Sequence, residues 1–116
     1  MIKTKSIYDE ISEEDGIRVL VTRYWPRGIK KEKKDYWFRD LGPEAGLIKK
    51  WKAEEISWEE FRKSYLDEFR SKEKTAHLEE LKGIIKSTKE VITLLCTCRE
   101  GEHCHRIILK EMLLKK

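Results

Sequence analysis

The sequence predicts an α/β fold: a small single domain with a largely parallel sheet covered by helices. Residues 17–22 and 91–96 are apolar runs rich in β-branched side chains, which is typical of buried strands. Residues 44–86, between them, show helical spacing of apolar side chains. Strands separated by helices indicate parallel pairing. A chain of 116 residues has room for one core, so we expect residues 1–116 to form one domain.

The strands are predicted from apolar runs and the turns that bound them. Residues 2–8 form the first predicted strand, and an acidic turn follows at residues 9–16. The second strand, residues 17–22, leads into the segment 23–28, in which Pro26 favours an extended backbone at the preceding tryptophan. The strand at residues 91–96 comes last.

Four helices are predicted from apolar spacing and capping signals. The first covers residues 44–53, and the second begins after Ser57, which forms a capping-box pattern with Glu60. The third covers residues 75–86, and the last ends near Leu114. Aromatic side chains on one face of the second helix are predicted to be core: Trp58, Phe61, Tyr65 and Phe69. The inner stripe of the last helix is predicted to be Ile108, Leu109, Met112 and Leu113.

The composition excludes several classes of protein. The 26 basic and 22 acidic residues are interspersed along the chain, which argues against a dedicated polyelectrolyte binder. No apolar stretch approaches the roughly 20 residues of a membrane span, and the N-terminus has no apolar signal core. Three cysteines within nine positions do not resemble a secreted disulfide framework. We therefore expect a cytoplasmic protein with no membrane partner.

The strand-to-helix segment at residues 96–106 is the predicted functional site. It contains all three cysteines and two of the three histidines, directly before a helix whose N-terminus favours negative charge. Ligands of open α/β sheets bind at the carboxyl ends of the strands. If the strands at residues 17–22 and 91–96 are sheet neighbours, Arg23, Arg27 and Arg106 will face one pocket together with the thiols. This convergence is the central hypothesis.

Several stretches of the chain resemble one family. They are residues 18–28, 35–37, 41–43, 58–69, 94–96 and 104–109. In this order they resemble the YeaO-like branch of domain-of-unknown-function family 488. The resemblance implies a small cytoplasmic α/β domain, in a family whose members mostly have no assigned activity. The chain departs from the family pattern at Ser6 and Glu44, and it has extra thiols at Cys96 and Cys98. A mechanism built on Cys98 therefore need not be a family mechanism.

The first interpretation of the site is a cysteine-dependent enzyme with an anion pocket. A helix start and nearby cations lower a thiol pKa from about 8.5 to between roughly 3.5 and 7.5, which favours Cys104 as the nucleophile. In this interpretation three arginines bind a phosphate or carboxylate, namely Arg23, Arg27 and Arg106. His103 or His105 would transfer protons. The thiol-phosphatase spacing of Cys, five residues and Arg is absent, because position 104 is cysteine and position 110 is lysine. A buried packing role for Cys104 stays open.

Three alternatives use the same residues or their neighbours. Cys96, Cys98 and Cys104 with His103 or His105 form a donor set that suits zinc, although paired zinc-knuckle spacing is missing. Cys98 and Cys104 are candidates for a reversible disulfide. A non-enzymatic nucleotide or RNA binder would use aromatic side chains that lie among basic residues. These aromatic residues are Tyr24, Trp25, Tyr36 and Trp37. Against that use, we expect Trp25 and Trp37 to cover the sheet.

The expected partner is a small anionic ligand, with phosphate or carboxylate on a metabolite or nucleotide. Nucleic acid is not favoured, and we predict no organic cofactor or metal as the leading interpretation. The sequence does not decide whether the chain is an enzyme, which substrate it takes, or its oligomeric state.

Overall fold

The sheet is parallel throughout, as predicted. In the computed structural model, which describes residues 1–98 and 103–114, four strands lie in the order β1-β4-β2-β3. They are β1 (Ile2–Ser6), β2 (Ile17–Leu20), β3 (Tyr36–Trp37) and β4 (Ile92–Cys96). The central strand β4 pairs with β1 on one side and with β2 on the other, all in parallel register. The strands at residues 17–22 and 91–96 are therefore neighbours.

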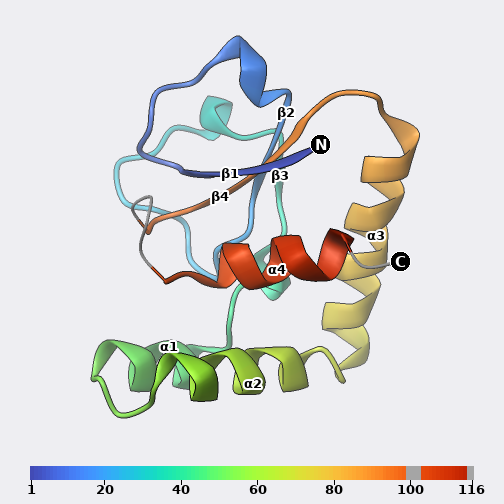
Figure 1. Ribbon diagram of the computed structural model, residues 1–116. Coiled ribbons are helices and arrows are strands. Elements are labelled where there is room, and N and C mark those ends of the chain that lie inside the picture. The colour runs from blue at the N-terminus through green and yellow to red at the C-terminus, as the bar shows by residue number, and fades with distance from the viewer. Residues whose placement is uncertain (99–102, 115–116) are drawn as a thin grey trace.

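The helices lie in two groups below and beside the sheet (Figure 1). They are α1 (Ala45–Lys52), α2 (Trp58–Glu68), α3 (Lys72–Ser87) and α4 (His105–Leu114). Helix α4 lies between the sheet and the α1–α2 pair, while α3 runs along one side of the molecule (Figure 1). A short 3₁₀ turn, Arg39–Leu41, packs against α3.

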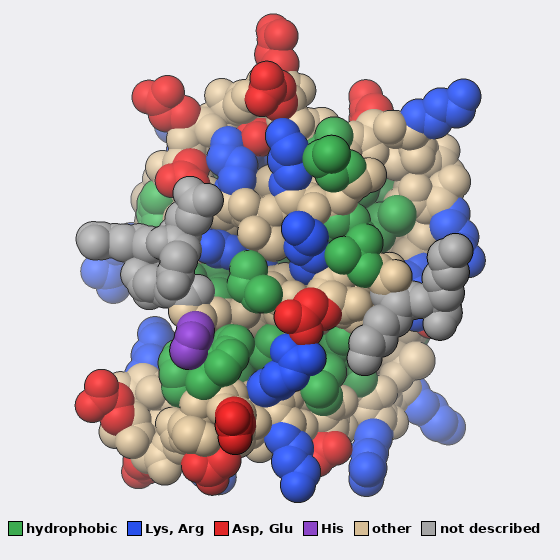
Figure 2. Space-filling view, viewed as in Figure 1, with side chains coloured by type: hydrophobic (Ala, Val, Ile, Leu, Met, Phe, Trp, Pro, Cys, Tyr) green, Lys and Arg blue, Asp and Glu red, His purple; other side chains and the backbone are tan. Residues whose placement is uncertain are grey.

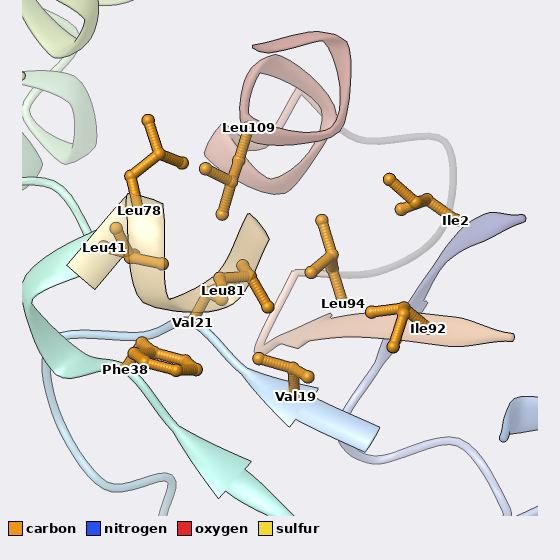
Figure 3. Packing of buried hydrophobic residues seen from close by; sticks show 10 residues of the cluster. All are labelled: Ile2, Val19, Val21, Phe38, Leu41, Leu78, Leu81, Ile92, Leu94 and Leu109. Atoms are coloured by element: carbon orange, nitrogen blue, oxygen red, sulfur yellow. The ribbon is translucent and has the colours of Figure 1, made fainter. Parts of the chain in front are cut away.

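The main core lies on the face of the sheet that α3 and α4 cover. Val19 and Leu94 point from the sheet toward Leu109 of α4 and toward Leu78 and Leu81 of α3, as Figure 3 shows. All five side chains are buried. Because side chains alternate across a strand, the next residues along β2 and β4 face the opposite side.

A loop, rather than a helix, packs on that opposite face. Leu20 and Leu95 form a buried cluster there, against which Trp25, Ile29 and Trp37 pack. The two indole rings meet edge to face, with centroids 5.2 Å apart. Each indole N–H donates to a backbone carbonyl, of Ile29 for Trp25 and of Thr22 for Trp37. The expectation that these tryptophans cover the sheet is confirmed.

A second core cluster joins α1, α2 and α4. Phe61 and Tyr65 of α2 are buried against Leu47 and Ile108, and Trp58 and Phe69 pack around them. The predicted capping box is present, since the Ser57 side chain accepts from the Glu60 N–H and the Glu60 side chain accepts from the Ser57 N–H. The aromatic face of α2 was correctly predicted.

Two elements differ from the sequence-based expectation. The helix expected at residues 75–86 begins at Lys72, because the Ser71 side chain accepts a hydrogen bond from the Lys74 N–H and caps it earlier. The two-residue strand β3 was not predicted, since it is too short to show a pattern. It pairs with β2 at the edge of the sheet.

The surface carries both signs of charge. On the described part of the face shown in Figure 2, Lys and Arg side chains intermingle with Asp and Glu, and hydrophobic side chains gather across the middle of the face, over α4. This mixture agrees with the interspersed charges of the sequence. None of the helices that the structure describes combines the length and apolar character needed to cross a membrane.

Candidate thiol and cation site

A cavity of about 300 Å³ opens at the carboxyl edge of the parallel strands. Tyr8 follows β1, residues 22–27 follow β2, and residues 96–98 end β4; all of them line this cavity. Residues 103–105 at the start of α4 complete that side. Because β2 and β4 are adjacent, their terminal loops close over one space, at the position where ligands of parallel sheets bind.

Three thiols lie together at the wall of the cavity. The Sγ atoms of Cys96, Cys98 and Cys104 all lie within 4.8 Å of one another. The Sγ atoms of Cys96 and Cys104 are 2.8 Å apart, and the Cys98 N–H donates to the Cys96 Sγ at 3.3 Å. Cys96 and Cys104 are buried, whereas Cys98 is partly exposed. Cys98 is therefore the thiol that a ligand in the cavity reaches most easily.

The pKa values of the three thiols diverge because they share hydrogen bonds. Hydrogen bonds with the Cys104 and Cys96 thiols lower the pKa of Cys98 to about 3, and the charge of Arg106 adds to this effect. Interactions with the Cys96 and Cys98 sulfurs favour the protonated form of Cys104 and raise its pKa, and burial raises it further. The bond with Cys104 lowers the pKa of Cys96, but its bond with Cys98 and its burial outweigh this and raise the value to about 11. The cluster thus concentrates negative charge on Cys98.

His105 is buried and fixed in orientation by the sheet. Its Nε2 lies 2.6 Å from the carbonyl oxygen of Val21, and its Nδ1 lies 3.7 Å from the Cys104 Sγ. Since a carbonyl only accepts, Nε2 carries the hydrogen and Nδ1 presents its lone pair to Cys104. Burial lowers the pKa of His105 to about 4, so the ring is neutral near pH 7.

His103 has a different environment. It is exposed and lines the cavity, with its ring centroid 4.5 Å from that of Trp58 and 6.4 Å from that of Trp51. The imidazole of His103 therefore packs on the aromatic cluster of α1 and α2. Of the two candidate histidines, His105 lies beside the Cys104 thiol and His103 lies against the aromatic side chains.

Arg106 lies behind the thiols and not among the residues that line the cavity. Its buried guanidinium donates through Nη1 to the Cys96 Sγ at 2.9 Å, to the Cys98 carbonyl at 2.8 Å and to the Lys5 carbonyl at 3.2 Å. The side chain joins β1 to the loop after β4. The structure therefore brings Arg23 and Arg27 to the cavity, while Arg106 holds the thiol segment in place.

Arg23 lines the cavity and also positions its opposite wall. Its Nε donates to the Pro43 carbonyl at 2.7 Å and its Nη2 to the Gly42 carbonyl at 3.1 Å, and Nη2 lies 3.4 Å from a Glu44 carboxylate oxygen. A Cβ at Gly42 would lie 2.4 Å from the backbone nitrogen of Arg23. Only glycine permits this approach, which brings residues 42–43 against the loop after β2.

Among the residues that the structure describes, Arg27 and Lys52 are the other lysine and arginine side chains at the cavity. The Arg27 side chain is exposed, and its carbonyl accepts a hydrogen bond from the Tyr8 hydroxyl at 3.2 Å. Sequence reasoning missed Lys52 and Tyr8, because a lysine among several on α1 and a tyrosine after an edge strand carry no distinguishing pattern. Among the described lining residues there is no aspartate or glutamate, so the fixed side-chain charges at the wall are positive apart from the thiolate.

The fold and site define a class: a parallel α/β domain with a cysteine cluster at the carboxyl edge of its sheet. A family model described as "Active DUF488-N3 subclade" matches residues 2–116. The chain belongs to this family, which confirms the resemblance found in the sequence. It is 34% identical over 114 residues to the uncharacterized protein YeaO of Escherichia coli K12, covering 97% of this chain and 96% of that protein.

Mycobacterial relatives are more distant. The uncharacterized proteins Mb3100c of Mycobacterium bovis and Rv3073c of Mycobacterium tuberculosis H37Rv are each 28% identical over 114 residues, which cover 97% of this chain and 92% of each relative. No solved structure matches the chain significantly.

Proposed function

We propose that the cavity binds a small anionic metabolite or nucleotide and that Cys98 attacks it as a thiolate. One observation carries the proposal: Arg23, Arg27 and Lys52 line a cavity that has a thiol of lowered pKa in its wall and no described carboxylate. Cations with nearby aromatic walls are suited to a planar ligand with a phosphate or carboxylate. The proposal places the protein in the cytoplasm, where thiols stay reduced.

The nucleophile of this proposal is Cys98 and not the Cys104 expected from the sequence. Cys104 is 3% exposed, and its thiol hydrogen is engaged by neighbouring sulfurs, so its pKa is raised. Cys98 is partly exposed and has a lowered pKa. A thiolate rather than a thiol is the attacking species. Cys104 and Arg106 then stabilise the anion of Cys98 instead of reacting themselves.

The proposed reaction is a displacement at an electrophilic atom beside the anionic group of the ligand. A bond forms between the Cys98 sulfur and that atom, and the leaving group departs with the electron pair of the bond that breaks. His105 presents Nδ1 to the Cys104 thiol and orients it; because burial lowers the pKa of His105 to about 4, the ring stays neutral, and no base is needed to form the Cys98 thiolate. His103 is the candidate to donate a proton on the aromatic side of the cavity.

Alkylation with iodoacetamide against pH tests the nucleophile. In metal-chelated, reduced protein we expect Cys98 to be labelled first and at a nearly constant rate from about pH 5 to pH 8, because its thiolate is already formed. Peptide mapping identifies the modified residue, and C98S removes the fast phase. C104S is the matched control and should retain a fast-reacting Cys98, slowed by the loss of one hydrogen bond. A labelling midpoint above about pH 8, or fast labelling at Cys104, contradicts the proposal.

Protection by inorganic phosphate tests the anion site. We expect phosphate to slow labelling of Cys98 in the wild type and to lose most of this effect in R27M, in which an exposed cation is removed without disturbing the core. K110M, on the far part of α4, is the charge-matched control. Equal protection in both variants would refute a specific role for the cavity cations.

A second candidate function is thiol redox chemistry, which the close approach of the sulfur atoms favours. A peroxide would oxidise the Cys98 thiolate to a sulfenic acid and release hydroxide. The Cys104 thiol would then displace water to form a Cys98–Cys104 disulfide. Mass spectrometry after mild peroxide treatment should show a loss of two hydrogens and a cross-linked peptide. Accumulation of overoxidised Cys98 without that cross-link would exclude Cys104 as the resolving thiol.

A further inference from the structure

The three thiols and one imidazole are the right chemical types for a metal site. Sulfur and imidazole nitrogen are the ligands that zinc prefers, and three thiolates disfavour magnesium, calcium and manganese. We propose that Cys96, Cys98, Cys104 and His105 form a four-ligand site for a zinc-class divalent ion in the wall of the cavity. The site uses the same Cys98 thiolate as the proposed reaction, so the metal-bound cluster would not attack a ligand; anion binding by the cations of the cavity does not depend on the metal.

The four side chains lie near a tetrahedral arrangement but must adjust to bind an ion. Zinc–sulfur bonds of about 2.3 Å and zinc–nitrogen bonds of about 2.0 Å place neighbouring ligands about 3.6–3.8 Å apart in a tetrahedron. The Cys104 Sγ and His105 Nδ1 are 3.7 Å apart, and the three sulfurs lie within 4.8 Å. The Cys96–Cys104 pair, at 2.8 Å, must open by about 1 Å. His105 is not among the ligand atoms that lie within 4.8 Å of one another, so its ring must also move toward the other two sulfurs.

The orientation of His105 supports a ligand role. A histidine that binds a metal ordinarily donates its other ring N–H to a carbonyl or carboxylate, which fixes the tautomer. Here Nε2 donates to the Val21 carbonyl at 2.6 Å, so Nδ1, which carries no hydrogen, faces the Cys104 sulfur at 3.7 Å. The sequence could not choose between His103 and His105. The structure separates them, because His103 packs against Trp58.

The surroundings also balance the charge of a metal–thiolate centre. Three thiolates and a divalent cation carry a net charge of −1, which a buried site must compensate. The Arg106 guanidinium supplies a positive charge and donates to the Cys96 Sγ at 2.9 Å. The Cys98 N–H also donates to this sulfur at 3.3 Å. Backbone and guanidinium donors around a coordinated thiolate hold the ligand in place.

Cobalt(II) substitution tests the site. Full-length protein is reduced, stripped with a chelator and titrated with Co²⁺ without oxygen. We expect one equivalent to produce the intense visible bands of a tetrahedral ion with thiolate-to-cobalt charge transfer, and one equivalent of Zn²⁺ to bleach them. Sub-stoichiometric cobalt in folded protein, or a spectrum without charge transfer, overturns the proposal.

Variants assign the ligands. H105A should weaken cobalt binding at least tenfold and shift the visible bands, whereas H103A, its matched control, should leave both unchanged; equal effects would refute the assignment to His105. C96S should reduce the charge-transfer intensity. If C96S does not fold, thiol counting in the wild type replaces it: Zn²⁺ should protect all three cysteines from alkylation, and protection of fewer than three contradicts the site. Phosphate protection in metal-free protein tests anion binding separately, so either proposal can fail alone.

Discussion

Replacing Lys74 by methionine is expected to lower the free energy of unfolding by about 3–5 kcal/mol. The Lys74 side chain is 2% exposed; its Nζ donates to the Asp40 carbonyl at 2.6 Å and to the Gly42 carbonyl at 2.7 Å, and it lies 3.2 Å from Glu68 Oε1. Methionine has a similar length but cannot donate. Two backbone carbonyls would lose a donor, and the Glu68 carboxylate would lose its buried counter-charge. Urea denaturation monitored by circular dichroism measures the change.

The double variant K74M/E68Q distinguishes the loss of the Lys74–Glu68 charge pair from the other effects of replacing Lys74. Burial lowers the pKa of Lys74 and raises that of Glu68, so each charge is costly without the other. Removing the carboxylate as well should recover part of the lost stability. K82M is the control at a partly exposed position on the same helix and should change the free energy of unfolding by less than about 0.5 kcal/mol. A K74M loss no larger than that of K82M would show that the buried lysine does not hold the loop.

Replacing Asp15 by asparagine is expected to cost about 3–5 kcal/mol near pH 7. The buried Asp15 carboxylate accepts from the Arg18 guanidinium, from Lys5 Nζ at 3.0 Å and from the Ser12 N–H at 3.0 Å. Asparagine keeps the shape but removes the charge, which leaves the buried Arg18 guanidinium without a counter-ion. D67N, at an exposed position on α2, is the control. Thermal and urea unfolding measure both variants.

The effect of D15N should depend on pH in one direction. Burial alone would raise the pKa of Asp15, but the Ser12 hydrogen bond and the charges of Lys5 and Arg18 together lower it below its ordinary value of 3.8. The contribution to stability is therefore complete above pH 3.8 and is lost as the pH falls through the lower, folded-state pKa. The difference in the free energy of unfolding between wild type and D15N should become smaller as the pH falls below 3.8. If this difference stays constant down to about pH 2, the pKa of Asp15 is not lowered in the folded protein.

The sequence predicted the sheet because buried parallel strands leave a local signal. Residues 17–20 and 92–96 are short runs in which apolar side chains predominate, and Ser57 with Glu60 sets the start of α2 through a local capping box. The sequence did not predict the cover on the second face of the sheet, because that packing depends on contacts between residues far apart in the chain. The face opposite α3 and α4 is covered by Trp25 of the loop after β2 and by Trp37 of the two-residue strand β3, and neither segment has a periodic sequence pattern.

The sequence predicted where the candidate site lies more accurately than it predicted what each residue of the site does. The neighbouring strands β2 and β4 put Arg23, Arg27 and the thiols around one cavity, as their positions at strand ends suggested. The direction of Arg106 depends on how α4 rotates against β1, which no local pattern sets. The difference between Cys98 and Cys104 arises from hydrogen bonds among the sulfur atoms, and these exist only in the folded chain.

The position of β4 in the sheet has a consequence for how the chain acquires its structure. β1 and β2 do not touch as strands; both pair with β4, and Ile2 meets Ile92. During synthesis from the N-terminus, β1 cannot pair until β4 has been made, about ninety residues later. Such distant pairing makes assembly slow and leaves apolar segments unprotected in the nascent protein. We therefore expect newly made chains to depend on chaperones until the middle strand inserts.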